Sequence, residues 1–250
     1  MVQAMFTAEP ELRYSDGIAA ERTMLAVRVN AAALQRRLPA GWESVPYEGD
    51  DLRGKSLRGA NVLIPFHEVY ASRSDDGTGG GTAQVSYIAF VSQARNLATG
   101  AMAHVHWFTY TEEPAGVPGR YRDGKLARIT RSLSFTKERR GETRVRQIVS
   151  AVGDAGQVDL SLAYEQGGLV VWLTADKPNL PLQAANDPDV VRWYQEDQVL
   201  NVVHSEPLNI DQVTELTFSV AGELADVFDG SEHVVAVVVQ RPYMRQVYVP

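Results

Sequence analysis

Lys125 and the histidine pair His104 and His106 are the strongest candidates for catalytic side chains in this sequence. Residues 119–135 read GRYRDGKLARITRSLSF, and from Lys125 onward the odd positions are apolar except for Arg131. This alternation is typical of a half-buried strand and predicts that Lys125 lies on its inward face. Burial would lower the pKa of the amine and make Lys125 a nucleophile toward a carbonyl. The other interpretation is that Lys125 lies in the preceding turn and extends into water.

His104 and His106 are two positions apart on a strand predicted over residues 101–111, so both face the same side. An imidazole titrates close to neutral pH and is suited to carrying protons. With a carboxylate such as Glu68 the pair could also bind a metal. No HExxH motif and no third histidine at a telling spacing accompanies them, so we favour pocket lining or core hydrogen bonding over a metal site. The residues predicted to share their face, as an amphipathic lining, are Met102, Phe108 and Tyr110.

Basic residues are concentrated between Gly119 and Arg146, where ten arginines and lysines face three acidic residues. We predict that most of them lie on solvated strand faces. Arg131 and Arg120 are the candidates for an inward position, where a guanidinium would bind an anionic group of a ligand. The net charge of the whole chain is −7, which argues against nucleic acid as the main partner.

The composition is that of a globular protein, with 44% hydrophobic and 22% charged residues in 250. We expect one domain over residues 1–250, because no linker or repeat divides the chain. No run of 18 apolar residues and no basic segment followed by an apolar one is present, so we expect no membrane partner and a cytoplasmic location. The absence of cysteine excludes disulfides, thiolate nucleophiles and zinc–sulfur sites.

Apolar alternation interrupted by short turns predicts some ten strands and two or three short helices. In the strand predicted over residues 83–93, Tyr87 shares a face with other apolar residues, and Ile88 and Phe90 lie on the opposite face, as in a strand covered on both sides. Helices are predicted at residues 31–37, from Pro188 into the region of Val203, and at residues 223–228. The fold class is therefore mainly β (α+β): a curved antiparallel sheet closed into a cone or barrel around an apolar cavity.

Three segments carry a resemblance to a known family: residues 29–42 (VNAAALQRRLPAGW), 59–68 (GANVLIPFHE) and 119–130. With them the chain resembles the acetoacetate decarboxylase-like superfamily. The resemblance implies a barrel around a cavity, a homo-oligomer, and a lysine that forms a Schiff base with a β-keto acid and needs no cofactor. Lys125 would take the place of the family's lysine pair. It stands alone here, and Gly124 replaces the proline before it.

The functional hypothesis is an acetoacetate decarboxylase-like enzyme that acts on a small or medium carbonyl or carboxylate compound. Lys125 would be the nucleophile, and His104 and His106 would carry protons. The residues expected to contact the substrate are Arg120, Arg131, Tyr87, Phe108, Tyr110 and Met102. The alternative hypothesis is a non-catalytic protein that binds an apolar or amphipathic small molecule.

Overall fold

A computed structural model describes residues 11–74, 85–113, 124–137, 141–178, 180–187 and 190–250. In these residues the chain forms fourteen strands and two short helices. The helices are α1 (Ala31–Gln35) and α2 (Leu52–Leu57). The strands are β1 (Arg13–Arg28), β2 (Trp42–Ser44), β3 (Val62–Ser74), β4 (Val85–Asn96), β5 (Met102–Thr111), β6 (Gly124–Lys137), β7 (Thr143–Gly153), β8 (Gly156–Glu165), β9 (Leu169–Thr174), β10 (Leu180–Ala184), β11 (Val191–Ser205), β12 (Ile210–Asp211), β13 (Val213–Gly222) and β14 (His233–Val249).

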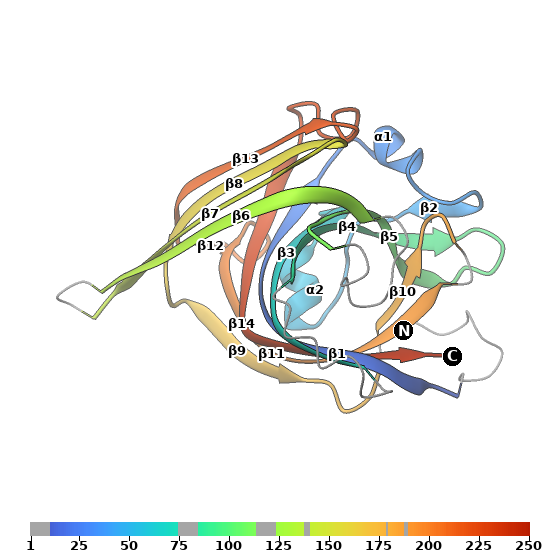
Figure 1. Ribbon diagram of the computed structural model, residues 1–250, viewed down its shortest axis with the longest axis horizontal. Coiled ribbons are helices and arrows are strands. Elements are labelled where there is room, and N and C mark those ends of the chain that lie inside the picture. The colour runs from blue at the N-terminus through green and yellow to red at the C-terminus, as the bar shows by residue number, and fades with distance from the viewer. Residues whose placement is uncertain (1–10, 75–84, 114–123, 138–140, 179, 188–189) are drawn as a thin grey trace.

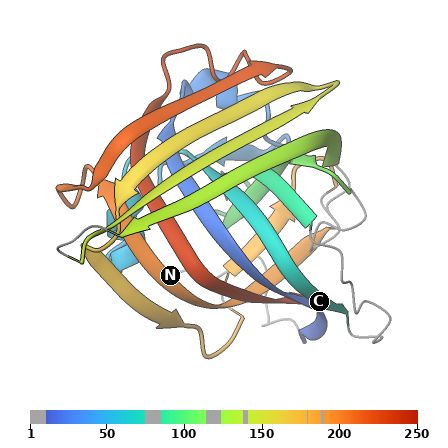
Figure 2. The ribbon, with the colours of Figure 1, turned by 60° about the vertical axis from the view of Figure 1, so that its left-hand side comes forward.

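Seven of the strands close into a barrel. Following the hydrogen-bonded neighbours, the ring runs β5–β10–β11–β14–β1–β3–β4 and returns to β5, as Figures 1 and 2 show. Most neighbours are antiparallel, but β5 pairs in parallel with both β10 and β6. The predicted mainly β barrel is therefore confirmed, although its sheet is mixed rather than wholly antiparallel.

The strand that begins near Lys125 lies outside this barrel. β6 pairs with β5 only over its first residues and then continues with β7, β8 and β13 as an outer sheet along one side of the barrel (Figures 1 and 2). The largest apolar core fills the space between that sheet and the barrel wall, with Val149 and Leu160 from the sheet and Leu25, Ile64 and Phe90 from the wall. Residues 124–135 thus begin the outer sheet, residues 119–123 lie outside the described part, and the barrel is built from other strands.

Alternation places opposite faces of the barrel strands in different environments. In β4, Tyr87 belongs to an inner cluster, whereas Ile88 and Phe90 pack under the outer sheet. All three are buried, so the prediction of a strand covered on both faces is confirmed. The short helix α2 packs against the inner side, where Leu57 joins an inner cluster and the Ser205 hydroxyl donates to the Ser56 carbonyl at 2.9 Å.

Two of the three predicted helices are wrong. Asn30 caps α1 as expected, its side chain accepting from two backbone N–H groups. The segment predicted to be helical from Pro188 is instead β11 from Val191 onward, and residues 188–189 lie outside the described part. Residues 223–228 form hydrogen-bonded turns rather than a helix. Within the described residues, neither helix has the length and hydrophobicity that a membrane span requires.

Candidate functional site

The interior of the barrel contains a cavity of about 550 Å³ including its open mouth. All seven barrel strands and α2 contribute to its wall. Six of the fifteen lining residues are aliphatic, and two are tyrosines. The other seven carry a guanidinium, an imidazole or a carboxylate: Arg22, Arg53, His67, His104, His106, Glu196 and Arg245. The cavity is amphipathic, and its polar side contains more charged residues than the predicted pair His104 and His106.

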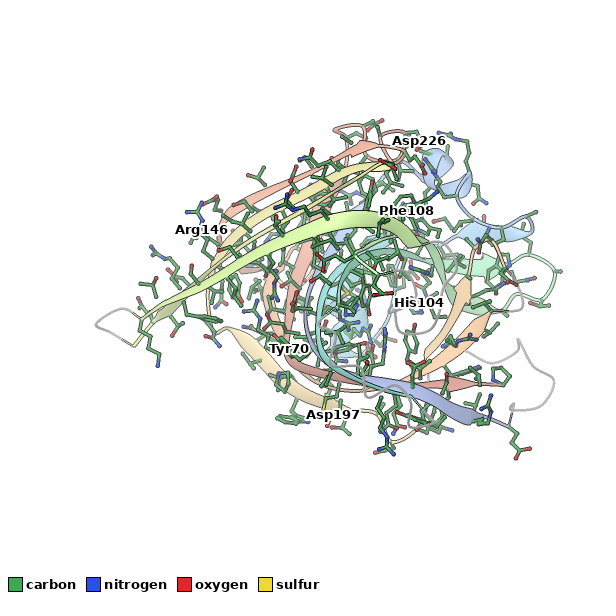
Figure 3. All side chains as sticks on the ribbon, viewed as in Figure 1. Tyr70, His104, Phe108, Arg146, Asp197 and Asp226 are labelled. Carbon is green, nitrogen blue, oxygen red and sulfur yellow. The ribbon has the colours of Figure 1, made fainter. Side chains whose placement is uncertain are left out.

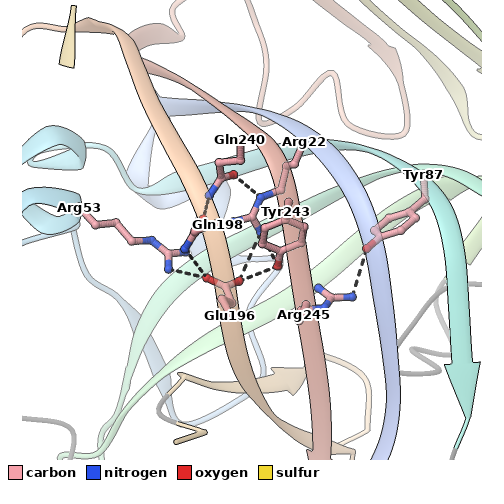
Figure 4. Close-up of polar contacts among 8 residues, drawn as sticks. All are labelled: Arg22, Arg53, Tyr87, Glu196, Gln198, Gln240, Tyr243 and Arg245. Atoms are coloured by element: carbon pink, nitrogen blue, oxygen red, sulfur yellow. Dashed lines mark hydrogen bonds and ion pairs between the residues drawn. The ribbon is translucent and has the colours of Figure 1, made fainter. Parts of the chain in front are cut away.

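Glu196 on β11 is the carboxylate of the polar side and is held by several donors (Figure 4). Arg53 Nη1 lies 2.9 Å from its Oε2, and the Tyr243 hydroxyl donates to its Oε1 at 2.6 Å. Gln198 donates to Oε2 at 3.1 Å. Burial alone would raise the pKa of Glu196, but the charges of Arg53 and Arg22 outweigh it and hold the pKa at about 2. Glu196 is therefore ionised at neutral pH.

Arg22 on β1 lies beside this carboxylate, with its Nη1 3.6 Å from Glu196 Oε1. Its Nε donates to Gln240, and its Nη1 donates to the Tyr243 hydroxyl at 3.0 Å. The guanidinium carbon lies 3.9 Å from the centre of the Tyr243 ring. The side chain is thus fixed by an aromatic face and by hydrogen bonds along one edge.

Arg245 on β14 occupies the neighbouring part of the wall. Its Nη2 donates to the Tyr87 hydroxyl at 3.2 Å, and its guanidinium carbon lies 4.2 Å from the centre of the Tyr194 ring. Tyr87 in turn stacks on His67, with the ring centres 4.3 Å apart. Burial raises the pKa of Tyr87 despite the opposing charges of Arg245 and Arg22, so this phenol stays protonated and remains a donor.

Three imidazoles complete the polar side. Burial, followed by the charge of Arg53, lowers the pKa of His104 to about 4. Burial, followed by the charge of Arg245, lowers the pKa of His106 to about 3, and the His106 ring hydrogen-bonds to the Thr109 hydroxyl. The pKa of His67 also lies well below its ordinary value because the ring is buried. All three rings are neutral at pH 7.

Of the predicted site residues, His104, His106 and Tyr87 line the cavity. Lys125 does not. It lies at the start of β6, outside the barrel, with its side chain 46% exposed and its Nζ 3.7 Å from Glu223 Oε2. The predicted inward position of Lys125 is wrong, because apolar alternation in β6 faces the core under the outer sheet rather than the cavity. The chain's other lysines, Lys55, Lys137 and Lys177, are also exposed, so no lysine amine lines the cavity.

Arg131 also lies away from the cavity. It forms an ion pair with Glu21 and lies 3.7 Å from Glu68, between the outer sheet and the outer face of the barrel wall. Its carboxylate partners belong to the protein, and it is not a lining residue of the cavity, so its predicted inward position at the cavity is wrong. Arg120 falls outside the described residues.

Phe108 and Tyr110 do not share a face with the histidines, because a bulge interrupts β5. The consecutive β4 residues Phe90 and Val91 pair with Phe108 and His106, which leaves Trp107 as an extra residue. An inserted residue reverses the alternation beyond it. Phe108 and Tyr110 therefore pack in the core under the outer sheet, whereas His104 lines the cavity. Figure 3 labels Phe108 and His104. Met102, at the start of β5, is half-buried and is not a lining residue.

Sequence reasoning missed the charged residues of the cavity: Arg22, Arg53, Glu196 and Arg245. The sequence does contain a signal for one of them: two adjacent charged residues, Glu21 and Arg22, must point to opposite faces of their strand. Arg22 faces the cavity while Glu21 faces the outer sheet, where it pairs with Arg131. A charged pair inside an otherwise apolar strand thus indicates that both faces carry a polar site.

The metal alternative for His104 and His106 gains no support from the geometry. In the part of the chain that the structure describes, no group of three or more His, Asp or Glu side chains could hold a metal ion. Glu68, the carboxylate considered with the pair, accepts from Ser86 at 2.7 Å and lies near Arg131 on the outer side of the wall.

Comparisons with known proteins find similar folds among solved structures. No family model and no curated protein matches the sequence. Among solved structures, the enduracididine biosynthesis enzyme MppR with HEPES buffer bound superposes with a TM-score of 0.53 at 16% identity, over 94% of this chain and 86% of that one. An acetoacetate decarboxylase-like enzyme from Sphingomonas wittichii RW1 gives a TM-score of 0.53 at 13% identity, over 94% and 90% of the two chains. The chain has the acetoacetate decarboxylase-like fold. The resemblance seen in the sequence is confirmed at this level, and such low identity transfers neither a substrate nor a catalytic residue.

Proposed function

We propose that this chain is an acetoacetate decarboxylase-like enzyme that binds a small carbonyl-containing carboxylic acid inside the barrel and acts on it without a lysine imine. The observation that carries the proposal is that, among the described residues, three guanidiniums line one cavity with a single carboxylate, Glu196. Guanidinium groups match carboxylates in charge and in geometry, and their surplus favours an anionic ligand.

The rest of the cavity and the structural relatives support the same class of ligand. Met24, Leu63 and Leu182 give the wall an aliphatic side, which suits the short hydrocarbon part of such an acid. MppR, which has a TM-score of 0.50 to this chain at 15% identity over 98% of this chain and 90% of that one, was solved in complex with pyruvate, a small oxo acid.

In this proposal the chemistry is proton transfer on a ligand held by its carboxylate. The Tyr87 hydroxyl accepts from Arg245, so its own proton can be donated to a ligand carbonyl oxygen and can stabilise negative charge that develops there. A neutral imidazole of His104 or His106 takes up the proton released next to the carbonyl. The bound anion also offsets the nearby positive charge, which raises the basicity of these rings.

The test incubates the protein with pyruvate, 2-oxobutyrate or acetoacetate in D₂O and follows proton exchange and product formation by NMR. A parallel sample is treated with borohydride and analysed by mass spectrometry. We expect exchange or turnover above the protein-free rate and no reductive adduct on lysine. Lys125→Ala serves as the control and should keep the activity, whereas Arg245→Gln should lose most of it. A borohydride adduct on Lys125 would refute the proposal.

One observation favours a second function, non-catalytic binding of the same class of acid. Imidazoles with pKa values of about 4 for His104 and about 3 for His106 are weak bases. Calorimetry and NMR together distinguish the two functions. A binding protein would show a saturable heat of binding for these acids, with no proton exchange and no turnover of any of them.

A further inference from the structure

Four neighbouring residues form a row across the inner wall of the barrel. Arg22 on β1 is paired in register with Gln240 on β14 and, on its other side, with His67 on β3. His67 is paired in turn with Tyr87 on β4. Directly opposed residues of neighbouring strands have Cβ atoms about 5 Å apart on the same face. The register therefore places Arg22 and His67 side by side on the same face of neighbouring strands, and both side chains line the cavity.

The contacts of Arg22 with the described residues leave one of its guanidinium nitrogens without a hydrogen-bond partner. Its Nε is bound by Gln240, its Nη1 by the Tyr243 hydroxyl, and its face lies on the Tyr243 ring (Figure 4). Its Nη2 is buried and has no hydrogen-bond partner within the described part of the chain. The residue is 5% exposed, so water does not compensate this donor as it would at the surface.

His67 shows the same feature from the adjacent strand. One face of its ring stacks on Tyr87, and the residue is 4% exposed. Its Nδ1 is buried and also lacks a hydrogen-bond partner among the residues described. Two buried polar atoms on directly paired residues, both at the cavity wall, are therefore unsatisfied together, and leaving such atoms unpaired costs stability.

We propose that Arg22 and His67 together bind the carboxylate of the ligand and that His67 takes up a proton as the anion binds. The inference rests on the proposed function and extends it to a residue pair and a change of protonation. A carboxylate oxygen accepts from Arg22 Nη2, and the second oxygen accepts from the protonated Nδ1 of His67. Both unsatisfied atoms gain a charge-assisted hydrogen bond, and the proton comes from the buffer.

The surroundings of His67 explain why the proton arrives only with the ligand. Burial first, and then the charges of Arg22 and Arg245 and the proximity of His106, keep the pKa of His67 well below its ordinary value. The titratable and charged groups that face it come from four strands: Arg22, Tyr87, His106, Tyr243 and Arg245. None of these groups is a carboxylate, so an incoming carboxylate supplies the negative charge that favours the imidazolium.

The test is isothermal titration calorimetry of pyruvate binding at pH 7 in phosphate and in Tris, whose ionisation enthalpies differ. The intact protein should take up close to one proton per pyruvate bound. His67→Asn keeps an amide donor near the Nδ1 position but cannot titrate, so it should bind pyruvate with no proton uptake. His67→Leu and Arg22→Gln should each weaken binding about 10- to 100-fold. His233→Gln changes an exposed histidine paired with Glu206 and should match the intact protein.

A second measurement needs no variant. The imidazole nitrogen shifts of His67 in the intact protein, followed by NMR during a pyruvate titration, should change from the neutral to the cationic pattern. Unchanged shifts at saturation, or equal affinity and equal proton uptake in His67→Leu, would overturn this inference and leave the proposed function standing. If neither pyruvate nor acetoacetate binds the intact protein, the proposed function fails, and this inference fails with it.

Discussion

Replacing Glu196 by glutamine should destabilise the protein because it removes the negative charge that Arg22 and Arg53 share inside the barrel. The substitution keeps the size of the side chain and an acceptor for the Tyr243 hydroxyl, so it changes mainly the charge. The pKa of Glu196 falls from an ordinary 4.5 to about 2 in the folded protein. At about 1.4 kcal/mol per pKa unit, this corresponds to about 3 kcal/mol of stability at pH 7. For a chain of this size we expect the melting temperature to fall by roughly 6–12 °C.

The pH dependence gives this prediction a second, independent test. Because the folded pKa is lowered, the contribution of Glu196 is fully present above pH 4.5 and is lost as the pH falls through about 2. The gap in unfolding free energy between the intact protein and Glu196→Gln should therefore shrink to roughly half by pH 3. Urea unfolding at pH 7 and pH 3, followed by circular dichroism, measures both gaps. A variant as stable as the intact protein at pH 7, or a gap that widens in acid, would refute the electrostatic account of the cavity.

Three further substitutions test residues of the outer sheet and of the cavity wall. Lys125→Ala should change the unfolding free energy by less than about 0.5 kcal/mol and leave pyruvate affinity unchanged, as measured by urea unfolding and calorimetry. Arg131→Met should lower the unfolding free energy, measured with urea, by about 3 kcal/mol, because it removes the cation that pairs with the part-buried Glu21 and Glu68. An unchanged unfolding free energy would contradict this. His106 is buried neutral with a pKa of about 3, so stability should fall as the pH drops from 6.5. His106→Gln should remove about 2 kcal/mol of the loss between pH 7 and pH 5; an unchanged slope would contradict it.

The alternation of residue types was sufficient to predict the barrel strands in which each face carries side chains of one kind. In β4 the alternation of Tyr87 with Ile88 and Phe90 corresponds to the observed inner and outer clusters. The Asn30 cap predicted the start of α1 correctly. These signals are local, and they depend on the period of the element and on hydrogen bonds to the nearest backbone groups.

The prediction failed where polar residues occupy inward positions. In β11 the inward side chains include Tyr194, Glu196 and Gln198, and the two polar residues conceal the period of two that identifies a strand. Conversely, the apolar alternation after Lys125 is real, but it faces a second core outside the barrel. This protein has two interiors, the barrel cavity and the core under the outer sheet. The alternation in a single sequence does not show which of the two a buried strand face points to.

Bulges account for the remaining error in the site. The extra residue Trp107 in β5 separates His106 from Phe108 onto opposite faces, and its indole donates to the buried Ser92 hydroxyl at 3.0 Å. A bulge is defined by pairing between strands, so the sequence of one strand does not show it. For the same reason the row from Gln240 to Tyr87, which spans four strands, became visible only with the register.

A crystal structure grown with pyruvate would show whether the barrel cavity binds a carboxylate through its arginines and without a lysine imine. We expect an intact pyruvate inside the barrel, with its carboxylate within hydrogen-bonding distance of Arg22 and with no bond to any lysine. Pyruvate joined covalently to Lys125, or bound only outside the barrel while the cavity holds none, would contradict it.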